Sequence, residues 1–287
     1  MRSMLFVPGD SARKLEKSLG TSADAVIIDL EDSVAMSRRD EARAMTNAFL
    51  RAHPDQPTGA PQLWVRVNPL STPDFARDLK AFDGVRPAGI VLPKTRNGDD
   101  VRAADEAITG ALGTGSACPL LAIATEVPIS VLSLATYIDC SANLIGLTWG
   151  AEDLSAELGA TTSRDGHGNL TSPFQLARDL CLMTAAAAGL AAVDSVFTDF
   201  RDHDALAAEC TAAARDGFTA KMAIHPAQVD VINRAFSPSK DDLEKARRII
   251  AAFETADSGV ASLDGQMLDR PHLARARQTL ARAKPAS

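Results

Sequence analysis

The chain alternates between short apolar runs and longer stretches with helical spacing. The runs are rich in branched residues and carry charge only in their last residues, which is typical of buried parallel strands. Between them, Ser11–Leu19 and Asp40–Ala52 show the spacing of helices that place their charges on one face. The apolar runs are Met4–Val7, Ala25–Asp29, Leu63–Val67, Gly89–Leu92, Leu120–Ala124, Asn143–Thr148, Ser195–Thr198 and Met222–Ile224. This alternation predicts parallel pairing of the strands.

Eight strand–helix units predict an α/β fold that closes into a (β/α)₈ TIM barrel, an architecture of roughly 250 residues. An open doubly wound sheet is the alternative, but no GxGxxG pattern follows the first run, which weakens its dinucleotide-binding form. We expect a barrel catalytic domain over residues 1–236 and a C-terminal helical extension over residues 237–287. In that extension Ser239 is a helix cap, a charged helix runs through Phe253, and a second helix covers His272–Ala283.

One interval between the runs is polar and unusually long. The segment Leu154–Pro173 is rich in Gly, Ser, Thr and Asp, so we expect it to be a loop after the sixth strand. Long loops in compact domains are usually functional lids or binding loops. The segment is therefore a candidate part of the site.

Composition narrows the functional class. The 287 residues are 46% hydrophobic and 23% charged, which is ordinary for a globular protein with a sizeable core. The net charge of -7 argues against nucleic acid or an anionic membrane as the main partner. The first apolar run is too short for a signal peptide or a membrane span, so we expect a cytoplasmic enzyme. The cysteines have no metal-ligand spacing, and buried free thiols are expected at Cys140, Cys181 and Cys210.

Polar residues follow the carboxyl ends of the runs. In a closed barrel these ends form one rim around one mouth, where the active sites of TIM-barrel enzymes lie. Polar residues are common at any single strand end because strand ends must reach water, but so many acids around one mouth favour a site. In chain order the rim residues are Pro8-Gly9-Asp10, Asp29-Leu30-Glu31-Asp32, Arg66 with Asn68, Pro93-Lys94, Glu126, Asp153, Asp199 and His225-Pro226.

The rim acids predict a bound divalent cation. Carboxylates crowded into one mouth repel each other unless a positive charge lies among them. Oxygen ligands without Cys or clustered His suit Mg²⁺, with Mn²⁺ possible, rather than Zn²⁺. Glu126 and Asp153, from neighbouring strands, are the candidate metal ligands. We expect Asp29, Glu31 and Asp32 to hydrogen-bond metal-bound water instead.

Two further rim residues are candidates for chemistry. Arg66 presents a planar fork of donors that suits a carboxylate or an enolate oxygen. The alternative is a salt bridge to Asp29 or Glu31 that only holds the rim together. His225 could act as a general base, although an imidazole followed by proline at a strand end also caps the backbone.

The rim motifs, in this order, resemble a known family, the citrate lyase β-subunit-like family of the HpcH/HpaI aldolase superfamily. Malyl-CoA and citramalyl-CoA lyases belong to that superfamily. The resemblance runs from Arg2 to about Ala276, and it is carried by FVPGD, VIIDLEDSV, WVRVN, VLPK, IATE, GAEDLSAELG, GFTAKMAIHPAQV and LDGQMLDRP. It implies a (β/α)₈ barrel, a homo-oligomer (trimer or hexamer), that binds Mg²⁺ and cleaves or forms a carbon–carbon bond beside an acyl thioester.

The resemblance also implies residue roles. Glu126 and Asp153 match the metal ligands, and Arg66 matches the arginine that binds the thioester or enolate oxygen. The family's C-terminal segment can bring an aspartate to a neighbouring subunit's active site, and Asp269 matches it; a helix cap before Pro271 is the alternative. One departure is the sequence ATEVP, where many members have IET or IES, so acyl specificity does not carry over.

The function implied is that of a Mg²⁺-dependent lyase that cleaves or forms a β-hydroxyacyl-CoA, such as malyl-CoA or citramalyl-CoA. The products are an acyl-CoA and an α-keto acid. The alternatives are a citrate lyase β-subunit acting on an acyl-carrier-protein thioester, a metal-dependent aldolase of free pyruvate, and a variant that hydrolyses the thioester. Candidate contacts to substrate and to the CoA phosphates are Arg13, Lys14, Lys17 and Lys94, with a solvated helix face as the alternative for the first three.

Overall fold

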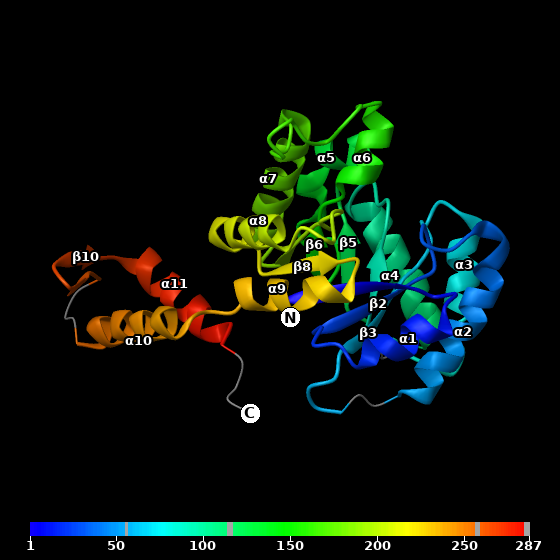
Figure 1. The fold of residues 1–287 in the computed structure, drawn as a ribbon, viewed down its shortest axis with the longest axis horizontal. Coiled ribbons are helices and arrows are strands. Elements are labelled where there is room, and N and C mark those ends of the chain that lie inside the picture. Colours follow the sequence, from blue (N-terminus) through cyan, green and yellow to red (C-terminus); the bar gives the residue numbers. More distant parts are fainter. Residues whose placement is uncertain (55–56, 114–116, 256–258, 284–287) are drawn as a thin grey trace. The chain divides into compact units, whose positions relative to one another are not determined.

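The computed structural model describes residues 1–54, 57–113, 117–255 and 259–283. Two compact units make up the chain, Met1–Asn233 and Arg234–Ser287. Unit 1 contains the barrel, and unit 2 is a small helical hairpin (Figure 1).

The first unit is a closed barrel of eight parallel strands in sequence order, which confirms the predicted fold class. Its strands run from β1 to β8, and β8 pairs with β1 to close the barrel. They are β1 (Ser3–Pro8), β2 (Ala25–Asp29), β3 (Gln62–Arg66), β4 (Gly89–Leu92), β5 (Leu120–Ile123), β6 (Leu144–Thr148), β7 (Ala191–Asp194) and β8 (Ala220–Ala223). Parallel strands need crossover connections, and helices supply them here.

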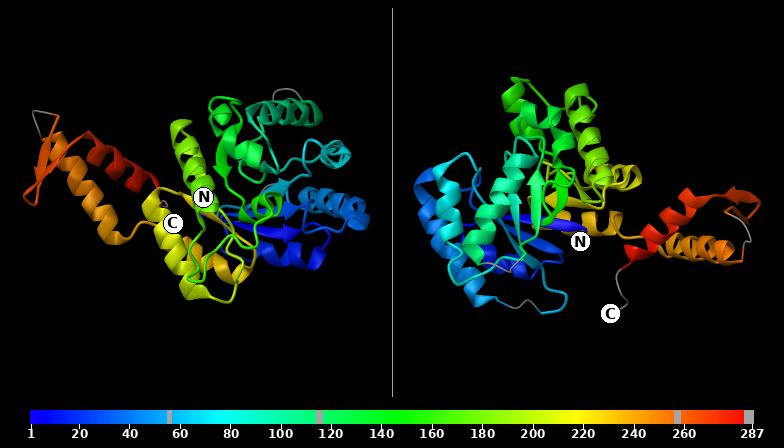
Figure 2. Two further views of the ribbon diagram at one scale, coloured as in Figure 1. Left: turned by 90° about the horizontal axis from the view of Figure 1, so that it is seen from above. Right: turned by 180° about the vertical axis from the view of Figure 1, so that it is seen from behind.

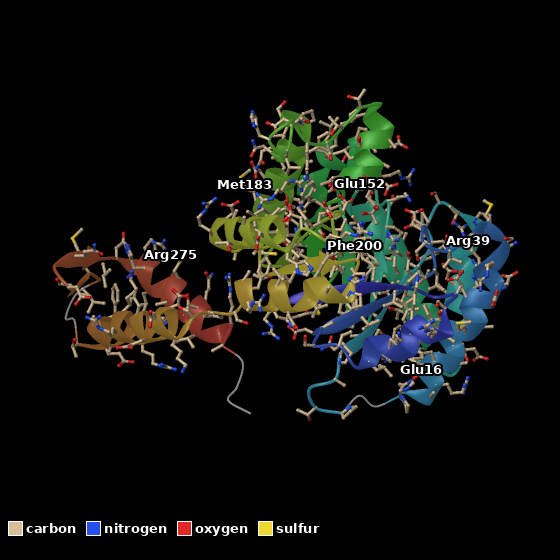
Figure 3. The ribbon with its side chains drawn as sticks, viewed as in Figure 1. Glu16, Arg39, Glu152, Met183, Phe200 and Arg275 are labelled. Carbon is tan, nitrogen blue, oxygen red and sulfur yellow. The ribbon has the colours of Figure 1, made fainter. Side chains whose placement is uncertain are left out.

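Helices surround the barrel strands (Figure 2). Their outer faces carry charged side chains such as Glu16 (Figure 3). Side-chain caps start two of them, because Asn97 accepts a hydrogen bond from the third residue of α4 and Asp202 does the same for α8. The helices are α1 (Ala12–Leu19), α2 (Arg39–Ala52), α3 (Pro73–Lys80), α4 (Gly98–Leu112), α5 (Pro128–Leu132), α6 (Ala151–Leu158), α7 (Ser172–Ala187), α8 (His203–Asp216) and α9 (Pro226–Ala235), with short 3₁₀ turns at Met36–Arg38 and Leu134–Tyr137.

The barrel interior is a packed apolar core. Alternate residues of the strands point inward, and the large indole of Trp64 fills one level of the barrel. Gly89 on the next strand makes room for it, since a Cβ there would lie 2.5 Å from the Trp64 ring. The other interior residues are Met4, Ala25, Ile27, Val91, Leu121, Ile123, Val193, Ala220 and Met222.

Two predictions about the second half of the barrel are wrong in detail. The seventh strand is Ala191–Asp194, not Ser195–Thr198. Its two alanines give no β-propensity signal, whereas Ser-Val-Phe-Thr does. The predicted loop is also too long: α6 continues to Leu158 and α7 begins at Ser172, so that only residues 159–171 lie between the two helices.

The second unit consists of two helices joined by a β-hairpin: α10 (Lys240–Glu254), β9 (Ala261–Leu263), β10 (Gln266–Leu268) and α11 (Arg270–Ala281). The Ser239 hydroxyl and the Asp242 carboxylate form a capping box at the start of α10, as the sequence pattern predicts for Ser239. Ala246, Ile249 and Ala276 form its small core.

Two further sequence expectations can be compared with the structure. All four cysteines are buried and free, as expected for three of them. Within residues 1–54, 57–113, 117–255 and 259–283, no helix combines the length and the apolar character needed to cross a bilayer.

Candidate active site

A cavity of about 360 Å³ opens at the carboxyl ends of the barrel strands. Trp149 is among its lining residues, and its charged lining consists of Lys14, Asp29, Asp32, Arg66, Glu126, Glu152 and Asp153. A larger surface groove of about 710 Å³ runs along residues 82–86 and 110–113, before β4 and β5 begin. Because catalysis on this fold takes place at the carboxyl ends, the smaller cavity is the candidate site.

Arg66 is fixed at the mouth by an acid on the neighbouring strand. Asp29 and Arg66 are cross-strand partners at the ends of β2 and β3. The Arg66 Nε and Nη2 groups each donate to one Asp29 oxygen at 2.7 Å, and Nη1 lies 3.0 Å from Glu31 Oε2. Burial favours a raised pKa for Asp29, but the charge and hydrogen bonds of Arg66 hold that pKa below its usual range. The guanidinium therefore cannot swing away without leaving a buried carboxylate unpaired.

Lys94 links the acids of the rim. Its backbone has a positive φ of 52°, which is uncommon outside glycine, and its N–H donates to Glu126 Oε2 at 2.5 Å. Its Nζ lies 2.5 Å from Glu31 Oε1, 3.0 Å from Asp32 Oδ2 and 3.2 Å from Asp153 Oδ1. Lys94 was a candidate substrate contact, and here three carboxylates engage its ammonium.

The two candidate metal ligands come from adjacent strand ends, as the sequence predicts. Glu126 follows β5 and is 2% exposed, while Asp153 lies in the first turn of α6 with its side chain 32% exposed. Gly150 leaves room for the Glu126 side chain, because a Cβ at position 150 would lie 2.7 Å from Glu126 Cγ. Burial raises the pKa of Glu126 well above its ordinary value, and the negative charges of Glu31 and Asp153 raise it further.

The charges at the mouth do not balance. Among the described residues, Arg66 and Lys94 are the cations in ion pairs with Asp29, Glu31, Asp32 and Asp153, while the rim acid Asp10 pairs with Arg38. We refer to these two cations and the acids around them as the mouth cluster. Burial is the largest influence on Glu31 and raises the pKa of its carboxyl to about 6. The buried Oε2 atom of Glu31 accepts no hydrogen bond from the described residues. The acids of the mouth cluster are Asp29, Glu31, Asp32, Glu126 and Asp153.

This donor set fits a hard divalent cation. Five carboxylates against two cations leave a negative excess, and burial together with the charges of Glu31 and Asp153 raises the pKa of Glu126, so that a cation beside it would be stabilised. The described residues contain no group of three or more His, Cys, Asp or Glu side chains that could hold a metal ion. Mg²⁺ does not need one, since it commonly takes one or two carboxylates and keeps several waters. Glu126 and Asp153 supply that number.

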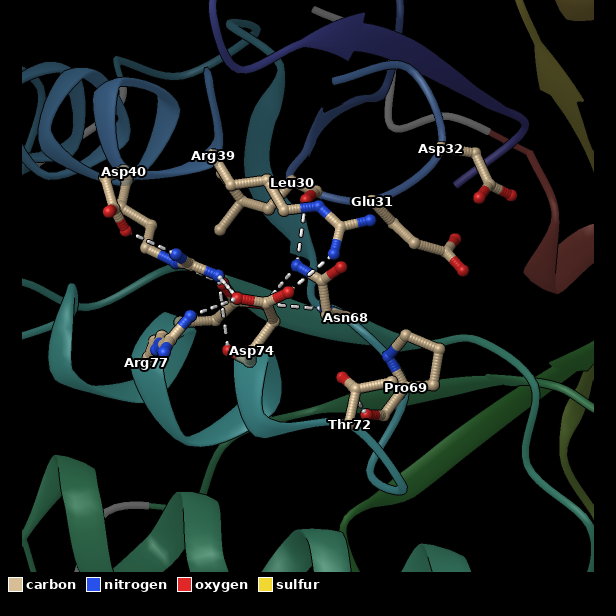
Figure 4. A network of polar contacts seen from close by, with 12 residues as sticks. Leu30, Glu31, Asp32, Arg39, Asp40, Asn68, Pro69, Thr72, Asp74 and Arg77 are labelled. Atoms are coloured by element: carbon tan, nitrogen blue, oxygen red, sulfur yellow. Dashed lines mark hydrogen bonds and ion pairs between the residues drawn. The ribbon is translucent and has the colours of Figure 1, made fainter. Parts of the chain in front are cut away.

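A buried network supports the loop that carries the rim acids (Figure 4). Asn68, just after β3, donates from Nδ2 to the Leu30 carbonyl at 2.9 Å. Asp78 Oδ2 accepts from Asn68 N and Nδ2 at 2.6 and 2.8 Å, and Arg43 Nε donates to Asp78 Oδ1 at 2.7 Å. The network fixes the backbone between two rim acids. The sequence marked Asn68 but gave no signal for Asp78 or Arg43, which come from helices.

The remaining candidate residues of the barrel differ in what they contact. Arg13, Lys14 and Lys17 are all exposed on α1, and Lys14 also lines the cavity. His225 accepts a hydrogen bond at Nδ1 from the backbone N–H of Ala227 at 3.2 Å. Its ring stacks on Phe200 with the centroids 4.7 Å apart. The contact with Ala227 is the backbone cap that the sequence offers for His225, and the general-base interpretation stays a prediction.

Asp269 belongs to the second unit, where it is the N-cap of α11. It forms a capping box with His272, whose Nδ1 lies 2.5 Å from Asp269 Oδ1. The hydrogen bond from His272 lowers the pKa of Asp269. The Asp269 side chain is 52% exposed within the chain. A capping role and an exposed carboxylate are thus both present at this residue.

Comparison with known proteins supplies the family. A sequence model of the HpcH/HpaI aldolase/citrate lyase family matches residues 2–226. A (3S)-malyl-CoA thioesterase of Cereibacter sphaeroides is 39% identical over 286 residues, covering 99% of this chain and 94% of that protein. The citrate lyase subunit beta of Leuconostoc mesenteroides subsp. cremoris is 31% identical over 285 residues, covering 97% and 92%.

A solved structure agrees over the same length. The protein CitE from Mycobacterium tuberculosis, crystallised with magnesium, acetoacetate and coenzyme A, matches with a TM-score of 0.80 and 33% identity. The match covers 98% of this chain and 97% of that one. These findings confirm the resemblance seen in the sequence motifs. The chain belongs to the HpcH/HpaI aldolase/citrate lyase family and is a lyase-family enzyme.

Proposed function

We propose that the protein is a Mg²⁺-dependent carbon–carbon lyase that acts on a β-hydroxyacyl-CoA such as malyl-CoA or citramalyl-CoA. The cleavage products would be an acyl-CoA and an α-keto acid, and the reverse reaction would condense them. The observation that carries the proposal is the negative excess of the mouth cluster around Glu126 and Asp153, beside the fixed guanidinium of Arg66. The similarity to a magnesium- and coenzyme A-bound relative supports it.

Glu126 and Asp153 would hold the metal ion. When bound, Mg²⁺ supplies a Lewis acid that polarises substrate oxygens and lowers the pKa of a substrate hydroxyl. Asp29 and Glu31 keep Arg66 in place, while Asp32 and Glu31 neutralise Lys94. In this arrangement Asp153 shares the Lys94 ammonium with Glu31 and Asp32, and Glu126 forms no ion pair among the described residues.

Arg66 would stabilise the enolate oxygen. A guanidinium carries five N–H donors, and Asp29 accepts hydrogen bonds from two of them. Glu31 Oε2 lies 3.0 Å from Nη1 and adds an ion pair. The donors that Asp29 does not use would be available to a ligand in the cavity that Arg66 lines. When the carbon–carbon bond breaks, its electron pair moves onto the thioester carbonyl as an enolate. A donor that is already fixed there stabilises this charge without reorganisation.

The C-terminal extension, residues 237–287, would complete the site of a neighbouring subunit in a homo-oligomer (trimer or hexamer). There Asp269 would deliver the proton that the enolate carbon needs after cleavage, or remove it in the condensation direction. The exposed carboxylate of Asp269 supports this role. Lys14 at the cavity, with Arg13 and Lys17 on the same helix, would contact the CoA phosphates.

The test is a panel of malyl-, citramalyl- and related CoA esters incubated with Mg²⁺, with released keto acid as the readout. Release of an α-keto acid with equimolar acyl-CoA is the expected result. Absence of keto-acid release from every CoA ester would contradict the proposal. Release only from an acyl-carrier-protein thioester would instead identify a citrate lyase β-subunit activity.

Thioester hydrolysis is the second candidate. The observation that favours it is the 39% identity to a (3S)-malyl-CoA thioesterase. In that reaction water adds to the thioester carbon, the C–S bond breaks, and the thiolate of CoA leaves. The same assay distinguishes the two, because hydrolysis releases free CoA thiol and the intact hydroxy acid without any keto acid.

A further inference from the structure

A second set of buried charges lies beside the cavity, between strands β7 and β8 and helix α8. Asp194 and Lys221 are cross-strand partners, exposed by 1% and 0%. Lys221 Nζ donates to Asp194 Oδ2 at 2.6 Å and to Glu209 Oε1 of α8 at 2.8 Å. Their strand neighbours Val193 and Met222 belong to the barrel interior, so the pair lies on the outer face of the sheet.

The inner end of this set reaches the cavity wall. Trp149, which follows β6 and lines the cavity, donates from Nε1 to Asp194 Oδ1 at 2.7 Å. Burial favours a raised pKa for Asp194, but the charge and hydrogen bond of Lys221 hold that pKa below its usual range. Arg178 Nε of α7 lies 3.7 Å from the same carboxylate. The only N–H of the indole ring thus meets a carboxylate that stays ionised.

The outer end reaches the loop between α6 and α7. Glu209 Oε2 accepts a hydrogen bond from Arg164 Nη2 at 2.7 Å. Arg164 also donates from Nη1 to the Gly168 carbonyl at 2.8 Å, and its backbone pairs with that of Leu170 in an antiparallel bridge. Arg164 therefore joins residues 159–171 to the buried charges, and these residues lie within Leu154–Pro173, the segment that the sequence predicts to be a lid or binding loop.

We propose that Arg164, Glu209, Lys221 and Asp194 form a chain of ion pairs that couples this loop to Trp149 and so fixes the wall of the substrate cavity. Asp194 and Lys221 are positioning residues, since they act through Trp149. Trp149 is thereby held at the cavity that it lines. The inference rests on the proposed function only in taking the cavity as the substrate site.

Tryptophan emission tests the coupling without any substrate. The chain has two tryptophans, Trp64 and Trp149, which are 1% and 3% exposed. Arg164→Gln removes the outer ion pair at a residue whose side chain is 32% exposed, so we expect the variant to fold. We expect a longer emission wavelength and stronger quenching by acrylamide as the indole loosens. The same change in a Trp149→Phe background should shift nothing, because the remaining Trp64 lies in the barrel interior.

Kinetics supply the second readout. Arg164→Gln and Trp149→Phe should each raise KM for the CoA ester by about tenfold with little change in kcat, as for lost contacts in a pocket wall. The control is Arg102→Gln, which breaks an exposed arginine–carboxylate pair on α4 and should match the wild type in emission and KM.

An Arg164→Gln variant with unchanged emission and unchanged KM would overturn the coupling. An equal spectral shift in Arg102→Gln would also overturn it. If the wild type turned over no CoA ester, the proposed function would fail, and the emission arm would still decide the coupling by itself.

Discussion

The barrel contains two clusters of buried charged residues that differ in the balance between acids and cations. In the mouth cluster five carboxylates face Arg66 and Lys94, and the pKa of Glu126 is raised by burial and by neighbouring acids. We refer to Asp194, Glu209, Lys221 and Arg164 as the β7–β8 cluster. There the two acids are paired with Lys221 and Arg164, Arg178 also lies 3.7 Å from Asp194, and the pKa of Asp194 is lowered despite equally deep burial.

The difference separates a binding role from a positioning role. Burial is common to both clusters, so burial alone does not identify a functional site. In a balanced cluster the acids and cations pair with each other and fix the side chains around them. In an unbalanced cluster the excess negative charge is neutralised only when a cation binds. The predictions below either break one cluster while sparing the other or measure the imbalance.

The largest effect is expected from breaking the balanced cluster. Lys221→Met leaves the buried Asp194 carboxylate without its main partner, which should lower the free energy of unfolding by about 3–5 kcal/mol. Urea denaturation measures it. The double variant Asp194→Leu, Lys221→Met should recover most of that loss, because an apolar pair replaces the ion pair. A single variant as stable as the wild type would contradict the account.

Breaking the mouth cluster at Arg66 should affect turnover instead. Arg66→Ala removes the donor for the enolate oxygen and should lower kcat by about 10²–10³, the scale of one oxyanion donor. Arg66→Lys keeps the charge without the planar fork, so we expect it to recover only part of the rate. A loss of tenfold or less in Arg66→Ala, with unchanged metal binding, would remove Arg66 from this role.

Titration with Mg²⁺ measures whether the negative excess of the mouth cluster binds a cation. Asp153→Asn should weaken Mg²⁺ binding by at least about tenfold, since even residues that only support metal ligands cost 10–100-fold. Calorimetric titration with Mg²⁺ measures this without substrate. Asp40→Asn is the matched control, because Asp40 is 92% exposed and lies on α2. Equal Mg²⁺ affinity in Asp153→Asn and the wild type would show that Asp153 is not a ligand.

The smallest effect concerns acid stability. The pKa of Asp194 is lower in the folded chain than in the unfolded one, so folding releases a proton from this group near its unfolded pKa of about 4. Its stabilisation is complete above that pH and is lost as pH falls further. The double variant Asp194→Leu, Lys221→Met should therefore lose stability less steeply below about pH 4 than the wild type. Parallel curves from urea denaturation would contradict this sign.

Much of the fold could be predicted because each strand and helix leaves a local trace. The apolar runs Ala25–Asp29 and Gly89–Leu92 match β2 and β4 residue for residue. The seventh strand was misplaced because its alanines are as common in helices. Because the predicted strand ended at Thr198, Asp199 and not Asp194 was placed at the strand end. The sequence therefore did not predict the β7–β8 cluster.

The sequence predicted individual residues of the site but not which of them form ion pairs with each other. Strand ends gave Arg66, Glu126 and Asp153, because chemistry on a barrel gathers where strands stop. The sequence could not show that Lys94 adopts a positive φ and serves as partner to three acids. Lys221 was equally hidden, because its partners Asp194 and Glu209 lie 27 and 12 residues away on other elements.

The central claim is that the negative excess of the mouth cluster is a cation site, and a crystal grown with Mn²⁺ tests it most directly. Mn²⁺ shares the oxygen ligands of Mg²⁺ and gives an anomalous signal. We expect one anomalous peak per chain in contact with the carboxylates of both Glu126 and Asp153. A peak away from these two residues, or none at a concentration that supports activity, would contradict the account.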